Sequence, residues 1–120
     1  MPSSAAKVQL RLRARLIHGD EIAMGPGKAD LLEAIAKFGS ITAAAHSMDM
    51  SYRRAWLLVD TMNRCFEEPL VIAATGGAKG GGAHLSKLGV DVVKDYRAMM
   101  SALEKTGAPH LQKFRKYLAT

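Results

Sequence analysis

Residues 39–66 constrain the fold of this 120-residue chain more than any other stretch. The first half follows Ser40, a residue type that often caps helices, and continues with the small side chains of Ala43, Ala44 and Ala45. Small side chains allow a second helix to cross at close range. A turn is expected at residues 48–50, and Ser51 is a second candidate cap. The stretch therefore predicts two helices joined by a tight turn, a helix–turn–helix.

The second of these helices has one buried face and one outward face. At about 100° per residue, four residues fall together on the predicted buried face: Ala55, Val59, Met62 and Phe66. Three point the opposite way: Arg53, Leu57 and Asp60. Arg54 is expected on one flank of the outward face. Tyr52 and Trp56 are expected on the other flank, with Trp56 as a packing residue.

The outward face of this helix is suited to DNA. Recognition helices use their N-terminal residues to contact base edges, and arginine binds guanine through two hydrogen bonds. An apolar residue at the centre of an outward face also indicates a covering partner. We therefore predict a DNA-binding set on this helix: Ser51, Tyr52, Arg53, Arg54 and Leu57. The alternative is that the two arginines are an ordinary solvated pair.

Residues 70–85 predict a β-hairpin with a glycine-rich tip, the wing of many helix–turn–helix domains. Residues 70–75 are apolar, and residues 83–85 are expected to form the returning strand. In the tip, Gly80 and Gly81 would allow close approach to a sugar-phosphate backbone, and Lys79 would neutralise a phosphate. A nucleotide-binding loop is disfavoured because Ala83-His84 follow where Lys and then Ser or Thr are needed. A loop with no partner is the remaining alternative.

The N-terminal region predicts a second hairpin. Residues 1–7 are expected to be a flexible tail, and residues 8–17 alternate between apolar and polar or basic side chains, as in a half-buried strand. Residues 22–24 continue the alternation as a short return strand. Arg11, Arg13 and Arg15 would form a solvated face of the strand, with phosphate contact as the alternative. Pro26 suits the start of a helix that Gly39 ends.

The last part of the chain predicts a long amphipathic helix that begins after Ser86. Its apolar stripe is wider than a small core needs, so we predict that part of it pairs with a second copy of the chain. The predicted dimerisation residues are Val93, Tyr96, Met100 and Leu103. Core packing alone is the alternative. Residues 106–109 are expected to break the helix, and residues 110–118 to form a short basic amphipathic helix.

The charge balance favours a polyanionic partner such as double-stranded DNA, because 17 Lys and Arg face 11 Asp and Glu, a net charge of +6. Cys65 is the single cysteine, which excludes a disulfide within the chain and fits a cytoplasmic protein. The four histidines show no metal-ligand spacing, so no metal is expected. We see no nucleophile–base pair and expect no enzyme. No apolar run reaches the roughly 20 residues that span a bilayer, so no membrane role is expected.

Several of these motifs together resemble the N-terminal DNA-binding domain of the ModE family of molybdate-responsive transcriptional regulators. The resemblance lies in Ser51-Tyr52-Arg53-Arg54-Ala55-Trp56, Asp60, Asn63, Pro69-Leu70-Val71, Gly76-Gly77, Gly80-Gly81-Gly82-Ala83, Leu85-Ser86 and Gly89. It implies a winged helix–turn–helix that forms a homodimer through its N-terminal strand region and last helix. It also implies binding to palindromic operators and repression of molybdate-uptake genes. The alternative function is non-specific, nucleoid-type nucleic-acid binding.

The chain departs from the family pattern after Leu103, where no strand-rich segment follows. We therefore expect no molybdate-binding domain and no cofactor in this chain, since molybdate sensing is implied by the family alone. The expected fold is mainly α with small β elements. Residues 8–105 would form the winged helix–turn–helix and dimerisation domain, and residues 106–120 the short C-terminal helix.

Overall fold

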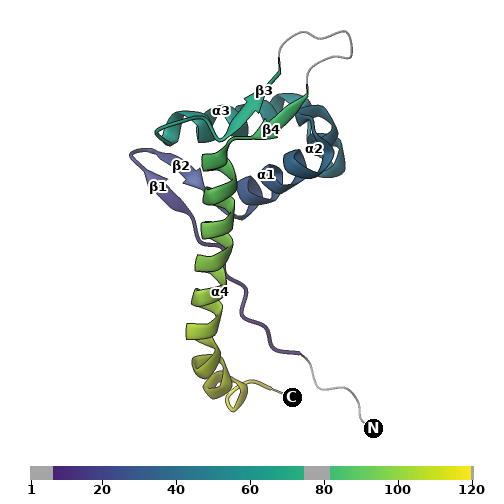
Figure 1. Cartoon of the computed structure of the whole chain (residues 1–120). Helices are drawn as coiled ribbons and strands as arrows, with labels where there is room; N and C mark the ends of the chain where they lie inside the picture. The colour runs from purple at the N-terminus through teal and green to yellow at the C-terminus, as the bar shows by residue number, and fades with distance from the viewer. Residues whose placement is uncertain (1–6, 75–81, 120) are drawn as a thin grey trace.

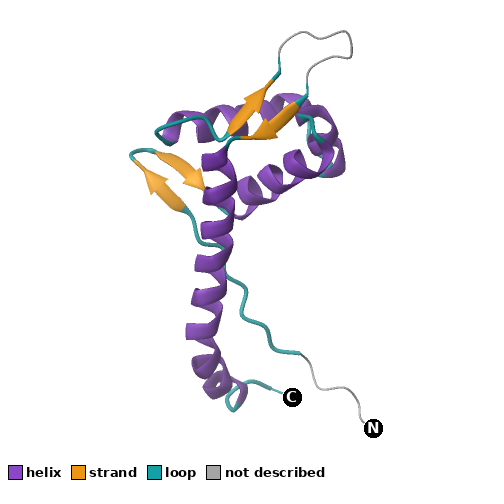
Figure 2. Cartoon of the chain, in the orientation of Figure 1, coloured by secondary structure: helices purple, strands orange, loops and turns teal. Residues whose placement is uncertain are grey.

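The computed structural model describes residues 7–74 and 82–119, with helices dominating over short strands (Figures 1 and 2). The elements in chain order are β1 (Leu16–His18), β2 (Glu21–Met24), α1 (Pro26–Phe38), α2 (Ile41–Ser47), α3 (Tyr52–Cys65), β3 (Val71–Ala73), β4 (Ala83–Leu85) and α4 (Lys87–Arg115). The predicted fold class, mainly α with small β elements, is confirmed.

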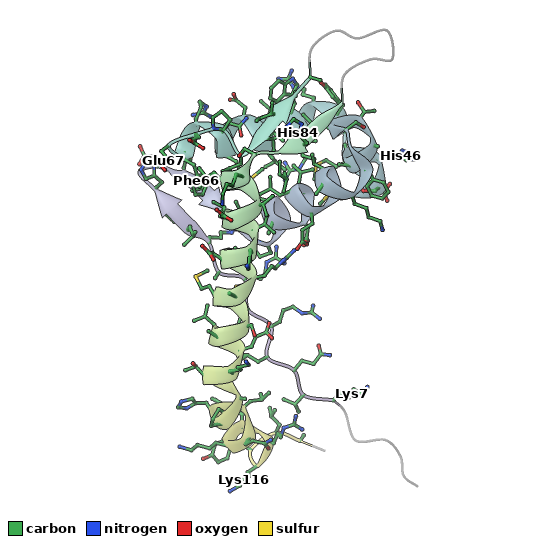
Figure 3. The ribbon with its side chains drawn as sticks, in the orientation of Figure 1. Lys7, His46, Phe66, Glu67, His84 and Lys116 are labelled. Atoms are coloured by element: carbon green, nitrogen blue, oxygen red, sulfur yellow. The ribbon has the colours of Figure 1, made fainter. Side chains whose placement is uncertain are left out.

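The molecule consists of a head and a stem. The head comprises β1 to β4 and α1 to α3, and the stem is α4, which runs from the head to the far end of the molecule (Figure 1). Lys116 lies at that far end, whereas His84 and His46 lie on the head (Figure 3). The resulting shape is elongated, with extents of 62 × 34 × 23 Å. In this arrangement α3 and the β3–β4 hairpin lie at the end opposite to the free end of the stem.

The core of the head forms where α1, α2 and α3 meet. Its largest fully buried side chains are Met24, Leu31, Leu32, Ile35, Val59, Met62 and Leu70. Each such side chain stabilises the fold by about 1.5–3 kcal/mol relative to full exposure. Pro26 begins α1 and Gly39 ends it with a left-handed φ of 76°, both as predicted.

The helix–turn–helix forms as its local sequence predicts. The Ser40 hydroxyl accepts a hydrogen bond from the Ala43 amide at 3.0 Å, and the Ser51 hydroxyl accepts one from the Arg54 amide at 3.1 Å. Both serines therefore cap their helices. Between the helices Asp49 adopts a positive φ of 56°, a conformation that Asp tolerates better than most residues.

The β3–β4 hairpin, hereafter the wing, is fixed to α3 by one side chain. Val71 pairs with Leu85, Ile72 with His84 and Ala73 with Ala83. The Asn63 side chain accepts hydrogen bonds from the amides of Leu70 (2.8 Å) and Val71 (3.1 Å) and donates one to the Val71 carbonyl (3.2 Å). Because Asn63 belongs to α3, the wing and the outward face of this helix keep a fixed relation to each other.

The predicted strand over residues 8–17 is wrong for most of its length. Regular pairing is confined to β1 and β2, where Leu16 opposes Met24 and Ile17 opposes Ile22, with an irregularity between Leu16 and Ile17. Residues 7–15 instead run as an extended segment beside α4 (Figure 1). The alternation reflects one-sided packing on a helix, with Val8, Leu12 and Ala14 half-buried, and needs no strand partner.

The predicted helix break at residues 106–109 is also wrong, because α4 continues through Pro109 to Arg115. A separate helix over residues 110–118 therefore does not form. Pro109 leaves the carbonyl four residues earlier without a donor. The adjoining residues are mostly exposed, so this carbonyl is accessible to solvent.

Polar contacts attach α4 to the head and to the extended N-terminal segment. The Ser86 hydroxyl donates to the Pro69 carbonyl at 2.7 Å and accepts from the Gly89 amide at 3.0 Å. Arg97 bonds to both Asp30 and Glu33 of α1. The buried Tyr96 hydroxyl donates to the Ala14 carbonyl at 2.7 Å, which fastens the extended N-terminal segment to the same helix.

Candidate nucleic-acid interface

The outward face of α3 exposes large side chains at the end of the molecule opposite to the free end of the stem. Tyr52 is 49% exposed, Trp56 42% and Leu57 55%, whereas Ala55, Val59 and Met62 on the opposite face are buried. Arg53, Trp56, Leu57 and Asp60 line a hollow of about 350 Å³ on this face. Trp56 is thus more exposed than expected for a packing residue, and it adds an indole N–H donor to the surface.

The charge on α3 changes along its length. Arg53 and Arg54 lie in the first turn, and within the described residues neither forms an ion pair. Near the C-terminal end, Arg64 bonds to Asp60 at 3.0 Å and to Glu21 at 2.9 Å. Positive charge therefore remains available at the N-terminal half of the helix, the half that recognition helices bring to base edges.

A second hollow joins the N-terminal half of α3 to α2 and the wing. Tyr52 lines it together with Thr42 from the first turn of α2 and with Ala73, Ala74 and Ala83 from the end of the wing next to residues 75–81. Its volume is about 280 Å³. The first turn of α2 and both strands of the wing therefore lie together on one side of α3.

On the other side of α3 the Arg54 side chain lines a third hollow with Arg13, Arg15 and Lys28. The structure thus separates the two adjacent arginines, because Arg53 lines the outward hollow and Arg54 the flank. Sequence reasoning did not predict this cluster, since its four cations come from three distant segments. The exposed alternation of Arg13 and Arg15 was the one hint.

Not every predicted site residue can be placed. Ser51, Tyr52, Arg53, Arg54 and Leu57 all lie in or just before the first turns of α3, whereas Lys79, Gly80 and Gly81 fall outside the described residues. Of the predicted dimerisation residues, Tyr96 is buried by its own chain, and Val93 and Met100 pack partly against the core of the head. Leu103, at 42% exposure, is the one that reaches the surface substantially.

Neither a set of metal ligands nor a membrane-spanning helix is found in residues 7–74 and 82–119. Within these ranges no three His, Cys, Asp or Glu side chains gather as a set of metal ligands. None of the helices described is both long enough and apolar enough to cross a membrane.

The three-helix head, its wing and the capped outward helix define a winged helix–turn–helix protein. No family model matches the chain. Individual proteins do match it. ModE of Azotobacter vinelandii, named a molybdenum transport protein, is 42% identical over 87 residues, or 69% of this chain and 32% of that protein. The molybdenum-pterin-binding protein MopA of Rhodobacter capsulatus is 42% identical over 82 residues, or 68% of this chain and 31% of that protein.

The DNA-binding transcriptional dual regulator ModE of Escherichia coli K12 is 38% identical over 80 residues, which are 67% of this chain and 30% of that protein. These matches, each over about two thirds of this chain, fit a ModE-family N-terminal domain. The chain spans about a third of the length of the curated relatives it matches.

Proposed function

We propose that this chain is a molybdenum-related transcriptional regulator that binds double-stranded DNA by placing the N-terminal half of α3 in the major groove. Arg53 and Leu57 would face the base edges, with Ser51 and Tyr52 at the start of the helix. The names of the Escherichia coli and Azotobacter vinelandii relatives support the class of function. A cytoplasmic location and repression of molybdenum-related genes belong to the same proposal.

The observation that carries the proposal is the contrast between the two faces of α3. Its inner face is buried in the core, whereas its outer face presents a guanidinium, an indole, a leucine and the Asp60 carboxylate around one hollow, and the exposed Tyr52 phenol lines a neighbouring hollow. A solvated surface helix gains nothing from exposing Trp56 and Leu57 side by side, whereas a groove in DNA would cover both. The net charge of +6 adds attraction to the phosphate backbone.

We further propose that the protein acts as a homodimer whose stems pack together. Leu10, Leu103 and Gly107 line an apolar hollow of about 380 Å³ between the N-terminal segment and α4. Leu16, Phe66 and Met99 line another hollow higher on the stem. Pairing through the stem would leave both α3 helices free at the opposite ends and would read a palindromic operator with two-fold symmetry.

The test is selection of binding sites from a random duplex library by the purified protein at physiological salt, with and without molybdate. We expect enrichment of an inverted repeat whose half-sites are about one helical turn, or a multiple of it, apart. Salt-sensitive binding without any enriched sequence would instead assign non-specific nucleic-acid binding. Failure to bind any duplex would overturn the DNA-binding function itself.

A further inference from the structure

The hollow that Arg54 lines gathers four positively charged residues. Its volume is about 270 Å³, and Arg13, Arg15, Lys28 and Arg54 contribute side chains to it from three segments. No Asp or Glu lines it. The remaining wall is formed by Ile22, Met50 and Leu58 and by Gly25, Pro26 and Gly27 at the start of α1, so the charged residues that line the hollow are all cationic.

The four cations have no counter-ion within the described part of the chain. The ion pairs that the structure shows there involve Arg64, Lys87 and Arg97. Burial lowers the pKa of the Lys28 ammonium, and the Arg15 and Arg54 charges act in the same direction, opposed by Cys65 and Glu21. Of these two opposing groups, Glu21 already pairs with Arg64 at 2.9 Å. A bound anion would therefore relieve the mutual repulsion of these cations.

The start of α1 adds a backbone contribution to the same hollow. Gly25, Pro26, Gly27 and Lys28 all line it. Gly25 precedes the first turn without a capping side chain, and that turn holds no acidic residue. The amide dipoles of this 13-residue helix consequently point towards the hollow without a protein carboxylate to receive them.

The position of the hollow identifies the anion. A helix with its side chains is about 10–12 Å wide and nearly fills a major groove of about 12 Å. When Arg53 and Leu57 face the base edges, the residues about 100° to either side face the two phosphate walls. Tyr52 and the end of the wing next to residues 75–81 would then lie against one wall, and Arg54 with its cluster against the other.

We propose that Arg13, Arg15, Lys28 and Arg54 bind a phosphodiester of the DNA strand that borders α3 on the side away from the wing. This inference rests on the proposed DNA-binding function and adds a second backbone contact to it. The site fixes the depth and register of α3 in the groove. It contributes affinity without reading sequence, because phosphates are alike in every site.

The test compares Lys28→Gln and Arg54→Gln with Arg53→Ala, and uses Lys105→Gln, on the exposed stem, as a matched change of charge. Affinities for the selected operator and for a random duplex are measured across a range of KCl concentrations. Each hollow variant should lose the same factor on both duplexes and flatten the logarithmic salt slope by about 0.9. Arg53→Ala should lose affinity mainly on the operator, and Lys105→Gln should change neither.

A second measurement locates the phosphate. A set of operators is made in which one phosphate at a time is replaced by a neutral methylphosphonate. At one position the wild type should lose affinity. At that same position Lys28→Gln and Arg54→Gln should bind the modified operator as tightly as they bind the unmodified one. Circular dichroism melting confirms that the variants fold. An unchanged salt slope, or additive losses at every phosphate, would overturn the proposal while leaving operator binding by the wild type intact. The proposal would also be overturned if the DNA-free chain bound inorganic phosphate at micromolar concentration and no methylphosphonate position showed a loss that the hollow variants lack. That result would assign the hollow to a small oxyanion.

Discussion

At the residue scale, Leu57 is the most unusual member of the proposed recognition surface. It lies one helical turn after Arg53, exposed beside Trp56 on the rim of the same hollow. Aliphatic and methyl-bearing groups in a major groove contact the C5-methyl group of thymine, which uracil lacks. Leu57 is therefore suited to distinguish a thymine from the other bases next to the position that Arg53 contacts.

We predict that Leu57→Ala weakens binding to the selected operator about fourfold, corresponding to about 0.8 kcal/mol for one buried methyl-sized group. When each operator thymine is replaced in turn by uracil, one replacement should weaken binding of the wild type by the same factor of about four. At that position the alanine variant should lose nothing further, as fluorescence anisotropy titrations would measure. Equal uracil effects on both proteins at all positions would remove Leu57 from base reading.

At the element scale, the start of α4 depends on a glycine. A Cβ atom on Gly89 would overlap the Leu70 carbonyl oxygen, because the first turn of the helix lies directly against the strand that begins the wing. We predict that Gly89→Ala lowers the free energy of unfolding by about 1–3 kcal/mol or more, as overpacking does. Urea unfolding followed by circular dichroism measures this loss.

The matched control is Gly27→Ala in the first turn of α1, where an added Cβ atom would meet nothing within 4 Å. This variant should keep its stability or gain up to about 1 kcal/mol, because alanine restricts the unfolded chain. Equal stability of the two variants would contradict the close approach of α4 to Leu70.

The link between α4 and α1 should depend on pH. Arg97 Nη2 lies 2.6 Å from Glu33 Oε1 and 2.6 Å from Asp30 Oδ1, and its hydrogen bond lowers the pKa of the Glu33 carboxyl. A carboxyl whose pKa is lower in the folded state than in the unfolded state stabilises the fold when the pH is above its unfolded pKa of about 4.3. This stabilisation is lost as the pH falls through the folded-state pKa. We predict that Arg97→Met costs about 1 kcal/mol at pH 7, since these groups are partly exposed and screened.

The difference between wild type and Arg97→Met should therefore shrink in urea titrations between pH 7 and about pH 3, as the pH falls below the unfolded value of about 4.3 and through the lowered pKa of the Glu33 carboxyl. It should also shrink in high salt. Lys87→Met, which removes an exposed pair with Asp91 at 3.4 Å within α4, is the control and should change stability little at either pH. A loss for Arg97→Met that persists at pH 3 would point to packing of its aliphatic part instead.

At the scale of the whole molecule, the elongated shape separates the proposed DNA-binding end from the proposed dimer contact. Leu103 lines the apolar hollow low on the stem. We predict that Leu103→Glu converts the dimer to a monomer in sedimentation equilibrium and weakens binding to a palindromic operator far more than to a single half-site. Val90→Glu, an exposed site where α4 leaves the head, should leave the mass unchanged. A wild type that is monomeric at micromolar concentration would contradict the dimer.

Local chemistry explains why much of this fold was predictable from the sequence. Helix caps, glycine at a positive φ and the spacing of Ala55, Val59 and Met62 act over a few residues, so the helix–turn–helix and the outward face of α3 were predicted correctly. The identities of Arg53 and Leu57 as outward residues follow from the same spacing.

Other features depended on which distant segments meet, and the tertiary structure alone decided them. Residues 8–15 alternate like a strand, yet α4 supplies the surface that they cover, and Pro109 is accommodated because water reaches the stem beside it. The separation of Arg54 from Arg53 required Arg13, Arg15 and Lys28 to gather beside α3. Periodicity reports that one face of a segment is covered, but only the packed chain determines what covers it and which charges it brings together.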